Sequence, residues 1–391
     1  MNENKYCQLR EAVDNVVAID AHCHNLVSKN SSVPFLSSFT LAEGAALADT
    51  PFTLPFKRSI RDAAELYKVN ASLSAIEKYR NSSTLESYGT KCFDASKLSA
   101  IFIDDGFVLD KMLDWKEHLL FVPQVGRILR IEFLALKILN QDLQQSSKQT
   151  LEEFTDLFLT QLRSTAKDVV CLKSIVAYLS GLEVNTHVTK KAAEKGLQEE
   201  LQGGIPLQII FNKNLIDYIF TLSLGVAKEL NLPMQIHTGL GQKLLDLTKA
   251  NPLLLRGVLE DSRFSENRFV LLHASYPFSR EASYLSSVYP QVYLDFGSVD
   301  SKLSIHGMKS AIKQLFELGP LNKIMYSSDG FAFPESYYFA SKNARDVIYS
   351  VLSDACDDGD LTISEAIEAV PAIFRQNALN FYDFSKVIKS G

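Results

Sequence analysis

The chain has 391 residues, of which 46% are apolar and 22% charged, and its formal net charge is −6. These proportions are typical of a globular protein with a large core, and the chain has no basic cluster of the kind that binds nucleic acid. No apolar run reaches the roughly 18–20 residues that cross a bilayer, and the N-terminus lacks the pattern of a signal peptide. The five cysteines are scattered, which is typical of a reducing compartment. We therefore expect a cytoplasmic protein with neither nucleic acid nor membrane as a partner.

Short apolar segments alternate with longer stretches of helical periodicity along the whole chain, which is typical of βα units around a parallel sheet. Several of these segments are apolar on both faces, as strands between a filled interior and outer helices must be. The first strand is followed by His-Cys-His instead of the glycine-rich loop of an open nucleotide-binding sheet. We therefore predict one domain over residues 1–391, a (β/α)8 TIM barrel. Its strands are expected at 16–22, 100–105, 120–125, 169–175, 233–238, 269–274, 291–296 and 323–328.

The connection between the first two predicted strands is far longer than an ordinary loop. Within it, residues 41–47 and 60–67 have helical periodicity, and Pro51 and Pro55 lie between them. We predict a helical insertion over about residues 27–97. Because it leaves the top of the first strand, we expect it to cap the barrel mouth; the alternative is a decoration on the barrel edge.

Histidines and one aspartate lie at the ends of separate predicted strands. His22 and His24 end the first strand, and residues two apart on a strand point the same way. His237 ends the fifth strand and Asp329 ends the eighth, where barrel enzymes place their chemistry. Histidine nitrogens with a carboxylate suit a zinc-like ion. We predict that His22, His24, His237 and Asp329 bind one divalent metal ion, with zinc preferred and manganese or iron as alternatives.

The catalytic roles follow from the same positions. Asp329 is also the predicted general base, because a carboxylate beside a metal can take a proton from water and deliver it to the leaving group. His273, which ends the sixth strand, either binds a second metal or polarises the scissile carbonyl, and we favour the second role. Asp20 is expected to orient a ligand. His118 has no strand-end position and is expected at the surface or behind the site.

Two cations are candidates for substrate binding. Lys173 lies within the fourth strand and is a carboxylated bridge between two metals, an ammonium that binds a substrate carboxylate, or a partly exposed side chain. We favour one metal with Lys173 bound to a substrate anion, because the other ligands already fill a mononuclear shell. Arg127, Arg130 and Glu132 follow the third predicted strand. We predict that Arg127 binds an anionic substrate; an ion pair that supports the following helix is the alternative.

These residues resemble the metal set of the amidohydrolase superfamily in its amidohydrolase-2 branch, which includes hydrolases and metal-dependent decarboxylases. A closer resemblance, over nearly the whole chain, is to the FluG-like amidohydrolase domain, and within it to the plant early-nodulin form. The segments that carry this resemblance are 53–58, 103–106, 126–132, 273–278, 293–297 and 327–330.

The resemblance implies a metal-dependent amidohydrolase that cleaves a C–N bond in a small amide, with a γ-glutamyl compound suggested by analogy. It also implies a glutamine-synthetase-like partner domain, because plant members carry one, and a homo-oligomer is left open. The alternatives are a weakly active or inactive metal-bound barrel with a structural or signalling role in nodulation, and a metal-dependent decarboxylase. Two residues depart from the family pattern, in which Gln242 is usually Asp and Leu179 is usually Arg. Both departures bear on the substrate and leave the metal set intact.

Overall fold

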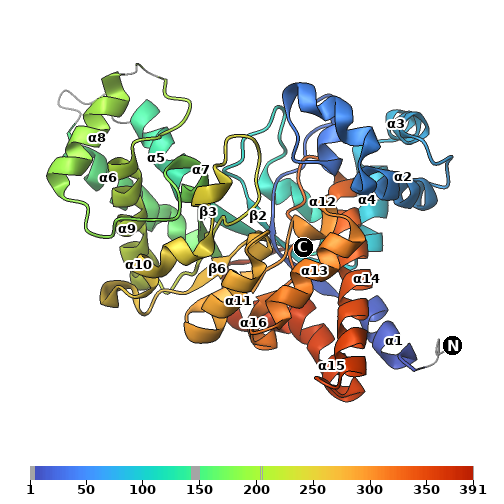
Figure 1. The fold of residues 1–391 in the computed structure, drawn as a ribbon. Coiled ribbons are helices and arrows are strands. Elements are labelled where there is room, and N and C mark those ends of the chain that lie inside the picture. Colours follow the sequence, from blue (N-terminus) through green and yellow to red (C-terminus); the bar gives the residue numbers. More distant parts are fainter. Residues whose placement is uncertain (1–4, 142–149, 203, 205, 391) are drawn as a thin grey trace.

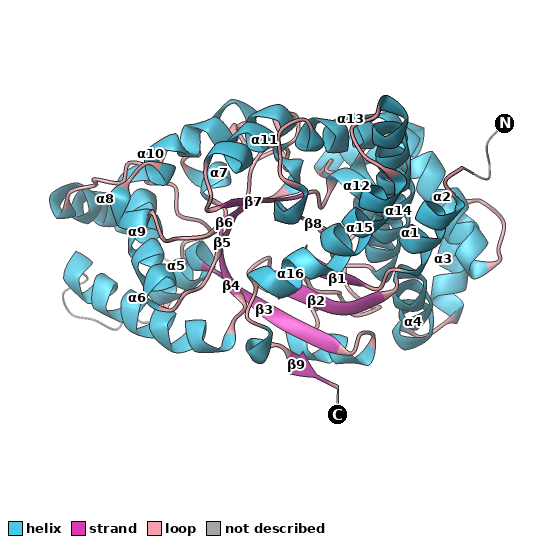
Figure 2. Cartoon of the chain, turned by 90° about the horizontal axis from the view of Figure 1, so that it is seen from below, coloured by secondary structure: helices cyan, strands magenta, loops and turns pink. Residues whose placement is uncertain are grey.

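Eight parallel strands surround the centre of the molecule, and each pairs with the next one in the chain. The computed structural model describes residues 5–141, 150–202, 204 and 206–390. Backbone hydrogen bonds join the last strand to the first, from Ala21 N to Tyr326 O at 3.1 Å and from Asp329 N to His22 O at 3.0 Å. The predicted TIM barrel is confirmed (Figure 2). The strands are β1 Ala18–Cys23, β2 Leu98–Asp104, β3 Gln124–Arg130, β4 Cys171–Ser174, β5 Met234–Ile236, β6 Phe269–Leu271, β7 Val292–Asp295 and β8 Ile324–Met325.

Apolar side chains fill the lower part of the barrel. Ile19, Phe102, Ile128 and Val270 pack there in one buried cluster, as the two-sided apolar pattern predicts. The C-terminal segment closes the bottom, where Tyr382 joins the same cluster just after α16, Asn377–Phe381. A short strand, β9 Ile388–Lys389, then pairs antiparallel with β3. The polar site is therefore confined to the opposite end of the barrel.

The third strand is the one that sequence analysis placed wrongly. Residues 115–120 form a short 3-10 helix, because Asp114 and Glu117 make a capping box at its start. The strand begins at Gln124 and continues to Arg130. Because strand side chains alternate, Ile128 and Arg130 share the interior face, whereas Arg127 points to the other side.

The insertion between β1 and β2 is helical, as predicted. Its helices are η1 Phe35–Phe39, η2 Gly44–Phe52, α2 Leu54–Tyr67, α3 Leu73–Ser82 and α4 Leu85–Ser96. Residues 41–47, expected to be one helix, instead lead into the 3-10 segment η2. The helices pack through Phe39, Phe56 and Tyr88 against Phe339 of the long helix α14, Pro334–Asp358. Figure 1 shows α2, α3 and α4 beside α14, at one side of the barrel.

The remaining helices cover the outside of the barrel. Helices α5, α6, α8 and α9 contact one another in a group at one side (Figure 1), and α11, α13 and α14 follow one another at the other. Within the described ranges, no helix has both the length and the apolar character needed to cross a membrane. The α-helices whose bounds have not yet been given are α1 Cys7–Asn15, α5 Ile131–Asn140, α6 Leu151–Thr165, α7 Val176–Leu179, α8 Lys190–Gln202, α9 Lys213–Glu229, α10 Arg256–Leu259, α11 Ser279–Val288, α12 Val299–Lys302, α13 Ile305–Phe316 and α15 Ile363–Pro371.

Candidate metal centre

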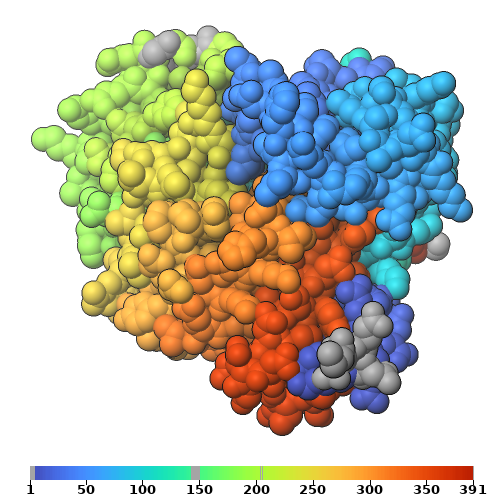
Figure 3. Space-filling model, turned by 45° about the vertical axis from the view of Figure 1, so that its right-hand side comes forward, coloured from blue at the N-terminus to red at the C-terminus, as the bar shows by residue number. Residues whose placement is uncertain are grey.

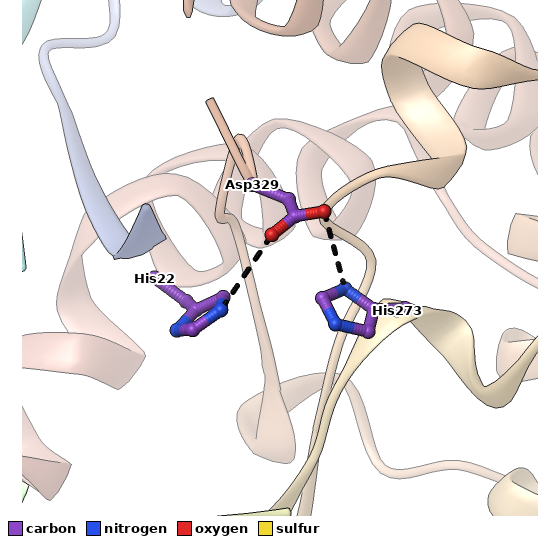
Figure 4. A group of neighbouring side chains, drawn as sticks. All are labelled: His22, His273 and Asp329. Carbon is purple, nitrogen blue, oxygen red and sulfur yellow. Dashed lines mark ion pairs between the residues drawn. The ribbon is translucent and has the colours of Figure 1, made fainter. Parts of the chain in front are cut away.

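The predicted site residues converge at the carboxyl ends of the strands, where a cavity of about 380 Å³ opens. The cavity is lined by His24, His237, His273 and Asp329 from the barrel, and by residues 40, 41 and 43 of the insertion. Figure 4 shows His22, His273 and Asp329 pointing toward one another, and Figure 3 shows the insertion, in blue, against the yellow segment that follows β5. A volume of this size is suited to a small molecule.

Departures from regular strand geometry aim these side chains. One extra residue of β1 lies between Asp20 and Cys23 in the pairing with β2, which is a bulge. His273 and Asp329 have left-handed backbones, with φ of +65° and +50°. Such conformations cost about 1–3 kcal/mol each and are concentrated at functional sites. The polypeptide therefore tolerates backbone strain where it presents two of the predicted site side chains.

Three atoms that can accept a proton lie close together beside the end of β1, namely Nε2 of His22, Nε2 of His24 and Oδ1 of Asp329. His22 Nδ1 lies 2.9 Å from Gln235 Oε1, and His24 Nδ1 lies 3.0 Å from the carbonyl oxygen of Asp104. A ring with a single N–H donates it from Nδ1 to the facing oxygen, and Nε2 is then the acceptor. These Nε2 atoms lie 3.6 Å and 3.3 Å from Asp329 Oδ1. Acceptors that converge in this way suit a divalent cation.

Gln235 fixes the ring of His22. Its amide nitrogen donates to the carbonyl oxygen of Ala21 at 2.8 Å and to the Tyr382 hydroxyl at 2.9 Å. The amide oxygen must therefore face His22 Nδ1, so that the barrel interior selects the tautomer of this predicted ligand.

His237 and His273 form a second convergence of nitrogens. His237 Nε2 faces the carbonyl oxygen of Leu240 at 2.9 Å, and His273 Nδ1 faces that of Gly297 at 3.3 Å. Burial lowers the pKa of His237 well below its usual range and that of His273 to about 4, so both rings are neutral. The remaining nitrogens, His237 Nδ1 and His273 Nε2, face each other at 3.0 Å. Two neutral rings cannot satisfy both carbonyls and this contact, whereas a cation between the rings would satisfy them all.

The predicted ligands are not equally close to one another. The ligand atoms of His22, His273 and Asp329 lie within 4.8 Å of one another, and those of His22, His24 and Asp104 do so as well. His237 belongs to neither group and reaches the centre through His273. The structure thus brings His22, His24 and Asp329 together and places His273 beside them, and metal binding by His237 stays a prediction.

Buried carboxyl groups hold the loops of the site. Asp20 accepts a hydrogen bond from Ser328 N at 2.8 Å, next to Asp329, and Asp295 accepts one from His273 N at 2.6 Å. Burial raises the pKa of Asp20 and of Asp295 to about 7. Burial would also raise the pKa of Asp329, but the histidines beside it, His273 first, hold that pKa well below its usual range, because His273 is itself protonated at the low pH at which a carboxyl titrates. Asp329 is therefore a carboxylate at neutral pH, as its predicted roles of metal ligand and base require.

The cationic wall of the cavity differs from the predicted one. Lys173 is buried in β4 and lines the cavity, and burial lowers its pKa to about 8. Arg130 also lines the cavity and pairs with Asp104 at 2.6 Å. Arg127 is not among the lining residues and pairs with Asp105 at 2.8 Å, because it lies on the opposite face of β3. The structure therefore favours Arg130 over Arg127 as a group that meets the substrate.

One of the two departures from the family pattern lies on the cavity wall. Gln242 lines the cavity, and its backbone nitrogen donates to the Tyr178 hydroxyl at 3.1 Å. The Tyr178 ring packs against His237 with 4.6 Å between ring centroids. Leu179 is not among the lining residues and packs against the large core outside the barrel.

Known proteins share this sequence in part. A model of the amidohydrolase family, Amidohydro_2, matches residues 220–384. The chain is 31% identical to Protein fluG of Emericella nidulans over 410 aligned residues, which cover 97% of this chain and 47% of that protein. The chain thus spans about half the length of this curated relative.

Known proteins also share the fold. A presumed metal-dependent hydrolase from Lactobacillus casei is 26% identical, with a TM-score of 0.84 over 95% of this chain and 96% of that one. A uronate isomerase from Thermotoga maritima has a TM-score of 0.65 at 13% identity, with 96% of each chain covered, and this similarity concerns the fold alone.

The chain is thus similar to amidohydrolases in the sequence of residues 220–384 and to a presumed metal-dependent hydrolase in its α/β-barrel fold, and its histidines and aspartate could hold a divalent metal. Over 97% of its length it is also similar to Protein fluG. None of the relatives named above is a plant nodulin, so the finer resemblance to that form stays a prediction.

Proposed function

We propose that this protein hydrolyses a C–N bond in a small amide with the help of a divalent metal ion. The observation that carries the proposal is the convergence of unprotonated histidine nitrogens on the Asp329 carboxylate at the floor of the cavity. Because histidine is the main donor, zinc is the proposed ion. The hydrolase from Lactobacillus casei, with the same fold over nearly its full length, supports this choice of reaction class.

The residues of the site divide the chemistry between them. A divalent ion, when bound, supplies Lewis acidity that lowers the pKa of water from about 15.7 to about 7. Asp329 accepts a proton from the attacking water and later gives it to the leaving amine. His273, whose Nδ1 lies 3.9 Å from Asp329 Oδ2, polarises the scissile carbonyl in the tautomer with its proton on Nε2, which gives up the 3.3 Å contact with the carbonyl oxygen of Gly297. Lys173 and Arg130 orient the substrate from the cavity wall.

The finer parts of the proposal rest on the FluG resemblance. A γ-glutamyl substrate and a glutamine-synthetase-like partner domain are proposed by analogy with the plant members of the resembling family, in which the two domains are fused. A homo-oligomer is also part of the proposal.

Metal analysis joined to product analysis tests the proposal. Purified protein should hold a stoichiometric divalent ion and release ammonia or an amine from γ-glutamyl amides or other small amides. The double variant His22→Ala/His24→Ala should lose both the metal and the activity. The matched control, His187→Ala/His306→Ala, removes two histidines outside the cavity lining and should keep both.

The products separate this proposal from its alternatives. Release of CO2 without amine would replace it with a decarboxylase. Stoichiometric metal with no turnover of any amide would favour a non-catalytic barrel with a structural or signalling role. Stoichiometric metal in the His22→Ala/His24→Ala variant would refute the assignment of the site.

A further inference from the structure

Lys302 is a cation on the cavity wall that has no role in the proposed metal centre. It is the last residue of α12 and lines the same cavity as His24 and Asp329. Its ammonium group donates to the carbonyl oxygen of Ser38 at 2.6 Å, in the insertion, and lies 5.2 Å from the centroid of the Phe331 ring. A lysine has three N–H donors, so the Ser38 contact uses one of them.

Lys302 makes no ion pair within the described part of the chain, and the carboxyl groups of Asp329 and Asp300 act on it only from farther away. Within the described part of the chain, no carboxylate lies within the 4.0 Å of an ion pair with its Nζ. Burial lowers the pKa of Lys302 to about 8, which leaves the group largely protonated at neutral pH. Glu43, the acidic residue that the insertion adds to the cavity lining, is exposed and makes no ion pair with Lys302. A partly buried cation in this state favours an anion.

The other two cations of the wall differ from Lys302. Arg130 is neutralised by Asp104, and Lys173 lies 3.4 Å from the ring nitrogen of His22. Lys302 lies farther along the cavity wall than Arg130, and two aromatic rings, one after the other in space, lie between these two cations. Phe331 lies beside Lys302, its ring centroid is 6.1 Å from that of Phe107, and Phe107 lies 5.8 Å from the Arg130 guanidinium.

The metal centre lies near one end of this row. The His24 ring packs against Phe107 with 5.3 Å between centroids. A ligand whose reacting group lies at His24 and Asp329 can therefore extend along Phe107 and Phe331 toward Lys302. The insertion covers that end through the Ser38 contact.

We propose that Lys302 binds a carboxylate of the substrate, so that the substrate class is an amide that also carries a free carboxylate. This inference rests on the proposed function, because it takes the metal centre as the place where the amide reacts. Carboxylate and ammonium form charge-assisted hydrogen bonds, which supply both affinity and orientation. Amides without a free carboxylate would leave the Lys302 charge unpaired and would bind more weakly.

Binding of non-reacting acids tests the inference without turnover. The probes are succinate, glutarate and adipate, each compared with the monoacid of the same chain length, butanoate, pentanoate or hexanoate, in calorimetric titrations of the metal-loaded protein. Neither kind of probe has an amide to hydrolyse, and the monoacid keeps one carboxylate and replaces the second with a methyl group. We expect at least one diacid to bind about 10–100-fold more tightly than its monoacid, the usual range for a hydrogen bond to a charged group.

Two variants of Lys302 and one control locate the effect. Lys302→Met should bind the diacid and its monoacid alike, whereas Lys302→Arg should keep most of the preference for the diacid. Lys323→Met is the matched control, because Lys323 also donates to backbone carbonyls, of Ser286 and Tyr289, but does not line the cavity. This control should keep the full preference, and thermal unfolding of each variant checks that the fold is retained.

Several results would overturn the inference. Equal binding of diacids and monoacids by the unaltered protein would do so, and so would an undiminished preference for the diacid in Lys302→Met. A role limited to holding Ser38 predicts that Lys302→Met weakens both probes equally. Failure of the proposed function looks different, since a protein that hydrolyses nothing can still show the Lys302-dependent preference.

Discussion

The hydrogen bonds of Gln235 give the most direct test of how the barrel prepares its metal site. We consider Gln235→Met, which keeps the size of the side chain and removes its polar atoms. The change deletes the contacts with His22 Nδ1, the carbonyl oxygen of Ala21 and the Tyr382 hydroxyl. At a net value of about 0.5–1.5 kcal/mol for each, the free energy of unfolding should fall by about 1.5–4.5 kcal/mol.

The effect on metal binding is separate from the effect on stability. Without the Gln235 oxygen, the His22 ring loses the partner that fixes its tautomer and orientation. Loss of such a partner weakens metal binding about 10–100-fold, or about 1.4–2.7 kcal/mol. We therefore expect a higher metal dissociation constant in competition titrations against a chelating dye. Denaturant unfolding in excess chelator gives the stability term alone.

A control and a refuting result complete this test. Gln291→Met removes a glutamine that bonds the carbonyl oxygen of Leu259, outside the cavity lining, and should leave metal affinity unchanged. If Gln235→Met binds metal as tightly as the unaltered protein, then the tautomer argument is wrong and His22 is not a ligand that depends on Gln235.

Three further predictions follow from the site and its surroundings. Asp329→Asn should keep the fold and lower any amide hydrolysis about 10²–10⁴-fold, because the asparagine side chain cannot take a proton from water. Undiminished turnover would show that another group is the base. Intact mass and metal analysis should find unmodified Lys173 and one metal per chain, whereas the added mass of one CO2 with two metals would establish a carboxylated bridge. Burial lowers the pKa of His118 from 6.5 to about 4, so the unfolded chain takes up a proton at a higher pH than the folded one. Stability should therefore fall as pH drops from about 6.5 to about 4, by up to about 3 kcal/mol, and His118→Asn should lose this part of the slope in urea unfolding series; an unchanged slope would contradict the assignment.

The barrel and much of its site could be predicted because apolar runs and strand ends are local signals. His237 and His273 follow short and mostly apolar strands, at the points where the chain leaves the sheet. The third strand failed because the apolar run at 119–122 has the composition of a strand, while the capping box at Asp114 selects a short helix just before it. That error also placed Arg127 where Arg130 lies, since the direction of a strand side chain depends on register.

Other parts of the site depend on contacts between distant segments, which no local pattern reveals. Gln235 lies two residues before His237 on β5 and so shares its inward face, which is a signal that could have been used. Its partners, Ala21 and Tyr382, come from opposite ends of the chain. Lys302 lies in a short helix with no periodicity, and its approach to Ser38 depends on how the insertion folds back over the mouth.

The first strand shows why a correct prediction can rest on an incomplete reason. Simple alternation gives His22 and His24 a common face, but Ile19 and Ala21 already point into the apolar barrel interior. Unbroken alternation from Ala21 would turn His22 away from that interior. The extra residue of β1 between Asp20 and Cys23 resets the alternation and brings His22 to the mouth beside Asp329. The strand thus keeps an apolar core below and the predicted metal-ligand pair above, and the bulge between them is the feature that makes both possible.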